Sequence, residues 1–182
     1  TFACGRAPEL RPLPTGAAIV CFGDSITSGA GVSENETYPA VLAALLGRPV
    51  INAGVAGEET AAGLTRLPEV LERHQPRLLV LCHGGNEMLS QVGDDPIAGY
   101  LRAMIRLAGY RDCDVILVSV PRPGMILSPA PFYRQVAREF GIPCENEILT
   151  AILSKGFLKS DYIHPNAEGY RKLAVALHLM MK

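Results

Sequence analysis

Four short segments of the chain combine residue types that could carry out nucleophilic catalysis. In chain order they are Gly23-Asp24-Ser25, Asn52-Ala53-Gly54, Gly84-Gly85-Asn86 and Asp161-Tyr162-Ile163-His164. A serine hydroxyl is a weak nucleophile at neutral pH and needs a base within hydrogen-bond reach. A neutral histidine can accept that proton, and a carboxylate on its other ring nitrogen fixes its tautomer and orientation. The segments therefore predict Ser25 as nucleophile, His164 as general base and Asp161 as the carboxylate that orients it.

The same segments offer hydrogen-bond donors for a negatively charged carbonyl oxygen. Such charge develops in the transition state of ester hydrolysis, and loss of one preorganised donor costs roughly 3–4 kcal/mol. The candidate donors are the backbone N–H groups of Ser25 and Gly54 and the side-chain amide of Asn86. A glycine at position 54 would let the backbone approach a substrate closely.

Residues beside these segments are the candidates for contact with a substrate. Loops usually determine specificity, and residues 121–132 and 157–158 are rich in apolar side chains that could line an acyl chain. The chain has no Trp, whereas a carbohydrate site would normally offer aromatic platforms. We therefore favour an acyl substrate over a sugar. The weaker candidates for lining the substrate site are Asp24, His83, Met88, Met125 and Ile163.

A parallel sheet is the structure that would bring these segments together. Short apolar runs predict buried strands at residues 17–22, 49–52, 78–82, 114–120 and 142–144. Amphipathic patterns predict helices at residues 38–46, 60–74, 97–108, 131–140, 145–153 and 167–181, the last capped by Asn166. Apolar strands that alternate with such helices indicate a three-layer α/β/α sandwich, in which ligands bind beyond the carboxyl ends of the strands. We expect one domain over residues 17–182, preceded by a proline-rich tether at residues 1–16.

As a set, the four segments resemble the signature blocks of the SGNH (GDSL-like) hydrolases. The resemblance covers residues 17–182, and the runs at 52–60 and 63–68 are similar to the bacterial branch of exported arylesterases, thioesterases and lysophospholipases. It implies a five-stranded parallel sheet in the flavodoxin-like order 2-1-3-4-5, an acyl-serine intermediate, and no metal or cofactor. Glu87 departs from the pattern, because many relatives in this branch carry an aspartate there that braces neighbouring loops.

Three functions are compatible with these residues. The first is hydrolysis of small-molecule acyl esters or thioesters, with short- to medium-chain acyl groups or lysophospholipids as substrates. The second is removal of O-acetyl groups from carbohydrates by an enzyme of the same family. The third is a non-catalytic α/β binding domain, which the intact set of five residues disfavours: Ser25, Gly54, Asn86, Asp161 and His164.

Composition and charge exclude several other classes of protein. The 182 residues carry a formal net charge of −1 with no basic stripe, so we expect no nucleic-acid partner. No apolar run approaches the roughly 20 residues of a membrane-spanning helix. The five cysteines form no CxxC pair, which argues against a zinc or thioredoxin-type site. Gly29-Ala30-Gly31 does not continue into a dinucleotide-binding loop, because Glu34 occupies the third glycine position and would repel a pyrophosphate.

Cys4 differs from the other cysteines because it stands near the first residue, ahead of the proline-rich stretch. The sequence Thr1-Phe2-Ala3-Cys4-Gly5 is similar to the end of a bacterial lipoprotein signal. We therefore expect an exported protein, periplasmic or anchored to a membrane through lipidated Cys4. The alternative is a free thiol in a disordered tail.

Overall fold

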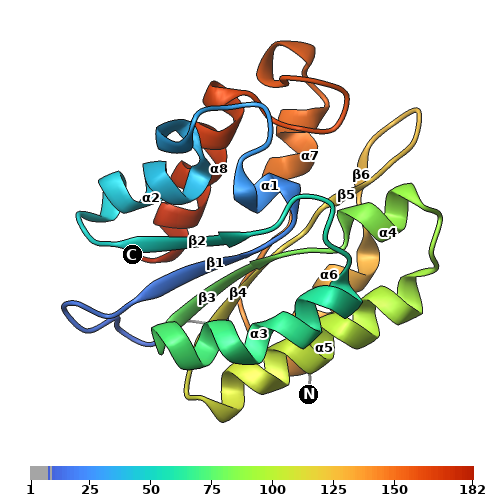
Figure 1. Cartoon of the computed structure of the whole chain (residues 1–182). Helices are drawn as coiled ribbons and strands as arrows, with labels where there is room; N and C mark the ends of the chain where they lie inside the picture. The colour runs from blue at the N-terminus through green and yellow to red at the C-terminus, as the bar shows by residue number, and fades with distance from the viewer. Residues whose placement is uncertain (1–7, 9) are drawn as a thin grey trace, which may run out of the picture.

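The computed structural model describes residue 8 and residues 10–182, so Cys4 lies outside the described residues. Its centre is a five-stranded parallel sheet in the order β2-β1-β3-β4-β7, with helices on both faces (Figure 1). The strands are β1 Ile19–Gly23, β2 Val50–Gly54, β3 Leu78–Cys82, β4 Asp114–Val118 and β7 Cys144–Glu145. The predicted architecture and strand order are therefore confirmed.

Eight α-helices surround the sheet in the described part of the chain. Helices α2 and α8 pack together on one face, and α3 and α5 pack together on the other (Figure 1). Short 3-10 helices occupy Glu34–Glu36 (η1) and Gly156–Leu158 (η2). The α-helices are α1 Ser25–Ser28, α2 Tyr38–Leu46, α3 Thr60–His74, α4 Gly85–Leu89, α5 Asp94–Tyr110, α6 Pro131–Phe140, α7 Ile148–Leu153 and α8 Ala167–Met180.

The central strands are buried because both of their faces are covered. Every residue of β1 and β3 is buried, which explains why these strands are apolar throughout rather than alternating. In the register of the sheet, Gly23 lies opposite both Gly54 and Cys82. The three strands thus end at the same level, and the segments that follow them emerge at one edge of the sheet.

Local capping explains where two of the predicted helices begin. The hydroxyl of Thr37 accepts a hydrogen bond from the N–H of Ala40 at 3.4 Å and begins α2. The side-chain oxygen of Asn166 accepts one from the N–H of Gly169 at 3.1 Å, so the predicted N-cap of the last helix is confirmed.

Several elements differ from the sequence prediction. The helix predicted at 145–153 begins at Ile148, because Glu145 belongs to β7 and its carboxylate accepts the N–H of Ile148 at 2.9 Å. Helices α1 and α4 were not predicted, since four or five residues are too few to show a helical period. The same holds for a small hairpin made of β5 (Pro121–Arg122) and β6 (Ser128–Pro129).

The described part of the predicted tether lies against the domain. Leu10 and Leu13 pack on the core, and the Arg11 side chain donates to the Asp114 carboxylate at 2.8 Å and also contacts Asp112. Residues 10–13 therefore behave as part of the folded unit rather than as a free linker.

Candidate active site

Ser25 is the first residue of α1 and directly follows the turn at the end of β1. A Cβ at position 23 would lie 1.9 Å from the carbonyl oxygen of Cys82, so only glycine fits there. Asp24 is buried and accepts the N–H of Ile26 at 3.1 Å, which begins α1, and burial raises the pKa of its carboxyl. The turn is therefore fixed from both sides, and it places the hydroxyl of Ser25 at the pocket described below.

The imidazole of His164 contacts both Ser25 and Asp161. Its Nε2 atom lies 2.9 Å from the Ser25 Oγ, and its Nδ1 atom lies 2.7 Å from Oδ2 of Asp161. An ionised carboxylate only accepts hydrogen bonds, so Nδ1 carries the proton and Nε2 is left to accept the serine proton.

The Asp161 carboxylate also organises the loop that carries the histidine. Its Oδ1 atom accepts the backbone N–H groups of Ile163 and His164, both at 2.8 Å. Burial raises the pKa of this carboxyl, but the hydrogen bonds from His164 and the backbone lower it further, so its pKa lies below the usual range. Asp161 is therefore ionised at neutral pH, as an orienting carboxylate must be.

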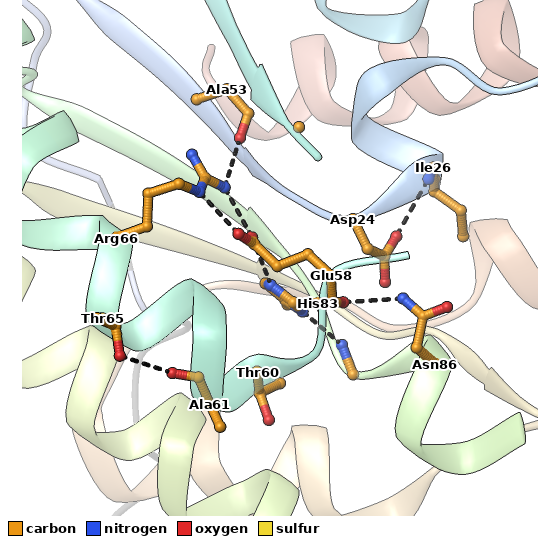
Figure 2. Close-up of polar contacts among 12 residues, drawn as sticks. Asp24, Ile26, Ala53, Glu58, Thr60, Ala61, Thr65, Arg66, His83 and Asn86 are labelled. Carbon is orange, nitrogen blue, oxygen red and sulfur yellow. Dashed lines mark hydrogen bonds and ion pairs between the residues drawn. The ribbon is translucent and has the colours of Figure 1, made fainter. Parts of the chain in front are cut away.

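Asn86, on α4, points its amide toward the same edge. The Nδ2 group donates to the backbone carbonyl of Glu58 at 2.8 Å, as Figure 2 shows. An amide nitrogen carries two N–H donors, and this contact uses one of them. The Ser25 N–H is the first of its helix and has no hydrogen bond to another described residue.

The backbone N–H of Gly54, predicted as an oxyanion donor, is not free. Its N–H already donates to the side-chain oxygen of Asn52 at 3.0 Å. A Cβ there would lie 2.1 Å from the backbone nitrogen of Ser28, so Gly54 is the point where α1 packs on β2. The requirement for glycine therefore comes from helix packing.

Gly57 is a second candidate for a backbone donor, and the sequence analysis did not consider it. It has a φ of +77° in a turn closed by the N–H of Glu58 and the carbonyl of Val55 at 3.2 Å. Its own N–H makes no hydrogen bond among the described residues, and its neighbour Glu58 contacts Asn86. The available signal was a glycine in the loop after the second strand.

A pocket opens beside the Ser25 hydroxyl. It is lined by Asp24, Ser25, Ile26, Gly85, Asn86, Leu89, Val120, Pro121, Pro123, Leu127, Leu153, Tyr162, Ile163 and His164. Most of this wall is apolar, and it comes from α4, the β5–β6 hairpin and the loop before α8. Val120 and Leu153 were not predicted because they carry no motif, and Tyr162 was not predicted as a lining residue although it lies inside the fourth segment.

Three of the residues predicted to line the substrate site do not line this pocket. His83 and Met88 are buried beneath the site, and Met125 is fully exposed at the tip of the hairpin. Asp24 and Ile163 do line it. The sequence shows which residues neighbour a motif, but it does not show on which side of the backbone each side chain lies.

Glu87 still braces the neighbouring loop, although it replaces the aspartate expected from the resemblance. Its Oε1 atom accepts both the backbone N–H and the hydroxyl of Thr60, at the start of α3. The longer carboxylate thus ties α4 to the loop that contains Glu58.

A serine, histidine and aspartate in hydrogen-bonded series at the carboxyl edge of a parallel sheet form the arrangement of a serine-type hydrolase. The chain belongs to the GDSL-like lipase/acylhydrolase family, whose model matches residues 21–172. Like the relatives described below, it is an ester hydrolase of that family.

Several characterised proteins resemble the chain over most of its length. It is 27% identical over 158 residues to thioesterase 1/protease 1/lysophospholipase L1 of Escherichia coli K12, covering 82% of this chain and 76% of the relative. It is 27% identical to esterase TesA of Pseudomonas aeruginosa, covering 81% and 79%. Among solved structures, AlinE4, an SGNH-hydrolase family esterase, is 28% identical with a TM-score of 0.71, covering 88% and 92%.

A crystal structure of TesA matches the fold with a TM-score of 0.80 at 24% identity, covering 91% of this chain and 98% of TesA. In the described residues, no helix is both long and apolar enough to span a membrane.

Proposed function

We propose that the protein hydrolyses carboxylic esters and thioesters through an acyl intermediate on Ser25. The observation that carries this proposal is the 2.9 Å contact between the Ser25 Oγ and His164 Nε2, together with the 2.7 Å contact from His164 to Asp161. The hydroxyl, base and orienting carboxylate are thus already in reach of one another, which is what acyl transfer requires.

The reaction has two halves, and in each of them His164 accepts one proton and then donates it. In the first, the Ser25 oxygen attacks the carbonyl carbon while His164 takes the hydroxyl proton, and the tetrahedral adduct collapses as His164 protonates the departing alcohol or thiol. In the second, water attacks the acyl-serine ester, His164 takes a proton from it and returns that proton to the Ser25 oxygen, and the carboxylic acid is released. The oxyanion is stabilised by the N–H of Ser25, the Asn86 amide and the N–H of Gly57, which replaces the Gly54 donor predicted from the sequence.

The pocket wall supports a short- to medium-chain acyl group as the bound part of the substrate. Leu89, Leu127 and Leu153 offer apolar surface beside the Ser25 hydroxyl. The names of the relatives include thioesterase, lysophospholipase and arylesterase, which agrees with acyl rather than sugar recognition. An acetylxylan esterase shares the fold, with a TM-score of 0.75 at 20% identity, so acetylated carbohydrate is the second substrate class to test.

A panel of substrates tests this function. The purified protein is expected to hydrolyse p-nitrophenyl acetate and butyrate and acyl thioesters, Ser25→Ala is expected to be inactive, and Ser154→Ala, an exposed serine on the C-cap of α7, should match the wild type. Activity on acetylated xylan alone would favour the carbohydrate esterase. Full activity of Ser25→Ala would remove Ser25 from its role, and an inactive wild type would favour a binding domain.

We also propose that the native protein is exported and acylated on Cys4. The support is the small residue before Cys4 and the proline-rich stretch after it. Mass spectrometry of the protein extracted from membranes is expected to show a lipid-modified Cys4, and an unmodified thiol would contradict this proposal.

A further inference from the structure

A buried charged cluster lies behind the candidate oxyanion hole and takes no part in the proton transfers. It consists of Glu58 in the β2–α3 loop, Arg66 on α3 and His83 at the end of β3 (Figure 2). Arg66 donates to the two Glu58 carboxylate oxygens at 2.8 and 2.7 Å, and His83 Nε2 lies 3.2 Å from Oε2 of Glu58.

The contacts of His83 determine which atoms of the cluster donate hydrogen bonds and which accept them. The N–H of Gly84 donates to His83 Nδ1 at 3.1 Å, so Nδ1 is an acceptor, and Nε2 carries the proton that it donates to Glu58. Arg66 also donates to the carbonyl of Ala53 at 3.0 Å, and its guanidinium lies 4.2 Å from the centre of the Phe22 ring. The carboxylate of Glu58 is therefore held by two donors that are themselves fixed by the sheet.

The cluster is largely removed from solvent, and its most exposed member is the Arg66 side chain, at 26%. The His83 side chain is fully buried and that of Glu58 is 7% exposed. A buried ion pair costs so much desolvation that apolar residues often stabilise a fold as well or better. A donor aimed at a transition state, in contrast, must be held to within a fraction of an ångström.

The backbone of Glu58 connects this cluster to the oxyanion hole. Its carbonyl oxygen accepts the Asn86 amide at 2.8 Å, on the residue whose carboxylate is clamped by Arg66 and His83 (Figure 2). We propose that Arg66, Glu58 and His83 are positioning residues that hold the Glu58 carbonyl in place and thereby aim the second N–H of Asn86 at the oxyanion. The inference rests on the proposed function.

A double-mutant cycle between Glu58 and Asn86 tests this inference, because Glu58→Ala removes the clamp but keeps the backbone carbonyl. Glu58→Ala is expected to lower kcat about 10- to 100-fold with KM changed less than about threefold, and Asn86→Ala to lower kcat about 10²–10³-fold. In the Asn86→Ala background, the further loss from Glu58→Ala is expected to be less than about threefold. Glu69→Ala, which breaks an exposed pair with Arg73 on the same helix α3, is the control and should leave kcat unchanged.

The double-mutant cycle can also overturn the inference. If Glu58→Ala lowers kcat by the same factor with and without the Asn86 amide, the cluster does not act through Asn86 and the inference is wrong. Should Glu58→Ala fail to fold, Glu58→Gln replaces it, and unchanged kcat in that variant would also overturn the inference. Failure of the proposed function would appear separately, as activity retained by Ser25→Ala.

Discussion

The Nε2 atom of His164 lies 2.9 Å from the Ser25 Oγ, although the two residues are 139 positions apart in the sequence. Ser25 begins α1 just after β1, and His164 lies in the loop before α8, so the contact exists only because the sheet brings both ends of the chain to one edge. Any change that moves either loop is therefore expected to act on catalysis.

Asp161→Asn tests the role of the carboxylate. The amide can still accept the backbone N–H groups, but it no longer holds the histidine proton on Nδ1, so the tautomer with a basic Nε2 is lost. We expect kcat toward p-nitrophenyl acetate to fall about 10²–10⁴-fold with the fold preserved. Asp112→Asn, at the other end of the sheet beside Arg11 and Arg77, is the control and should retain full activity. A fully active Asp161→Asn enzyme would mean that another group orients the histidine.

The ionisation of Glu58 is expected to make the stability of the fold depend on pH. Burial raises the pKa of its carboxyl, but the hydrogen bonds and charge of Arg66 lower it further, so the folded-state pKa lies below the unfolded value of about 4.3. The ionised carboxylate therefore stabilises the fold above about pH 4.3, and this contribution is lost as the pH falls through the folded-state pKa. The difference in Tm between the wild type and Glu58→Gln should be constant from about pH 7 to 5 and shrink at lower pH. A difference that grows in acid would contradict the assigned direction.

Two glycine substitutions are expected to have opposite effects on stability. Gly54→Ala places a Cβ 2.1 Å from the Ser28 backbone nitrogen and should cost about 1–3 kcal/mol of unfolding free energy. Gly99→Ala lies on the open surface of α5 and should gain about 0.5–1 kcal/mol, because alanine favours a helix. Urea unfolding of both variants measures this, and equal effects of the same sign would argue against the α1–β2 packing.

Leu127→Trp tests whether the pocket binds the acyl chain. The larger side chain would fill space beside Ser25, so kcat/KM for octanoyl esters is expected to fall at least about tenfold relative to acetyl esters. Ile126→Trp, on the neighbouring residue whose side chain is exposed, should leave the chain-length profile unchanged. An identical profile for all three proteins would place the acyl group elsewhere.

The sequence was sufficient to predict the sheet, the main helices and the meeting of Ser25, His164 and Asp161, because these depend on periodicity and on short motifs. It led to a choice of Gly54 as the backbone donor and left Gly57 unconsidered, although Gly57 lies three residues beyond the end of the second strand. The choice depends on the Asn52 side chain and on the packing of α1, and neither is visible in a local pattern.

The pocket wall and the charged cluster could not be predicted from the sequence either, because both depend on tertiary packing. Leu153 and Tyr162 come from separate elements that meet only in the folded chain. His83 was predicted to line the substrate site, but its ring is buried beside Gly63 of α3 and contacts Glu58 instead. Side-chain direction after the end of a strand depends on tertiary packing.

Labelling with a fluorophosphonate, followed by intact-mass measurement and peptide mapping, tests the central claim most directly. The reagent bonds to a serine oxygen only when that serine is activated by a base. We expect one adduct per chain, located on Ser25, absent in Ser25→Ala and formed much more slowly in His164→Ala. An adduct on a different serine, or equal labelling of Ser25→Ala, would contradict it.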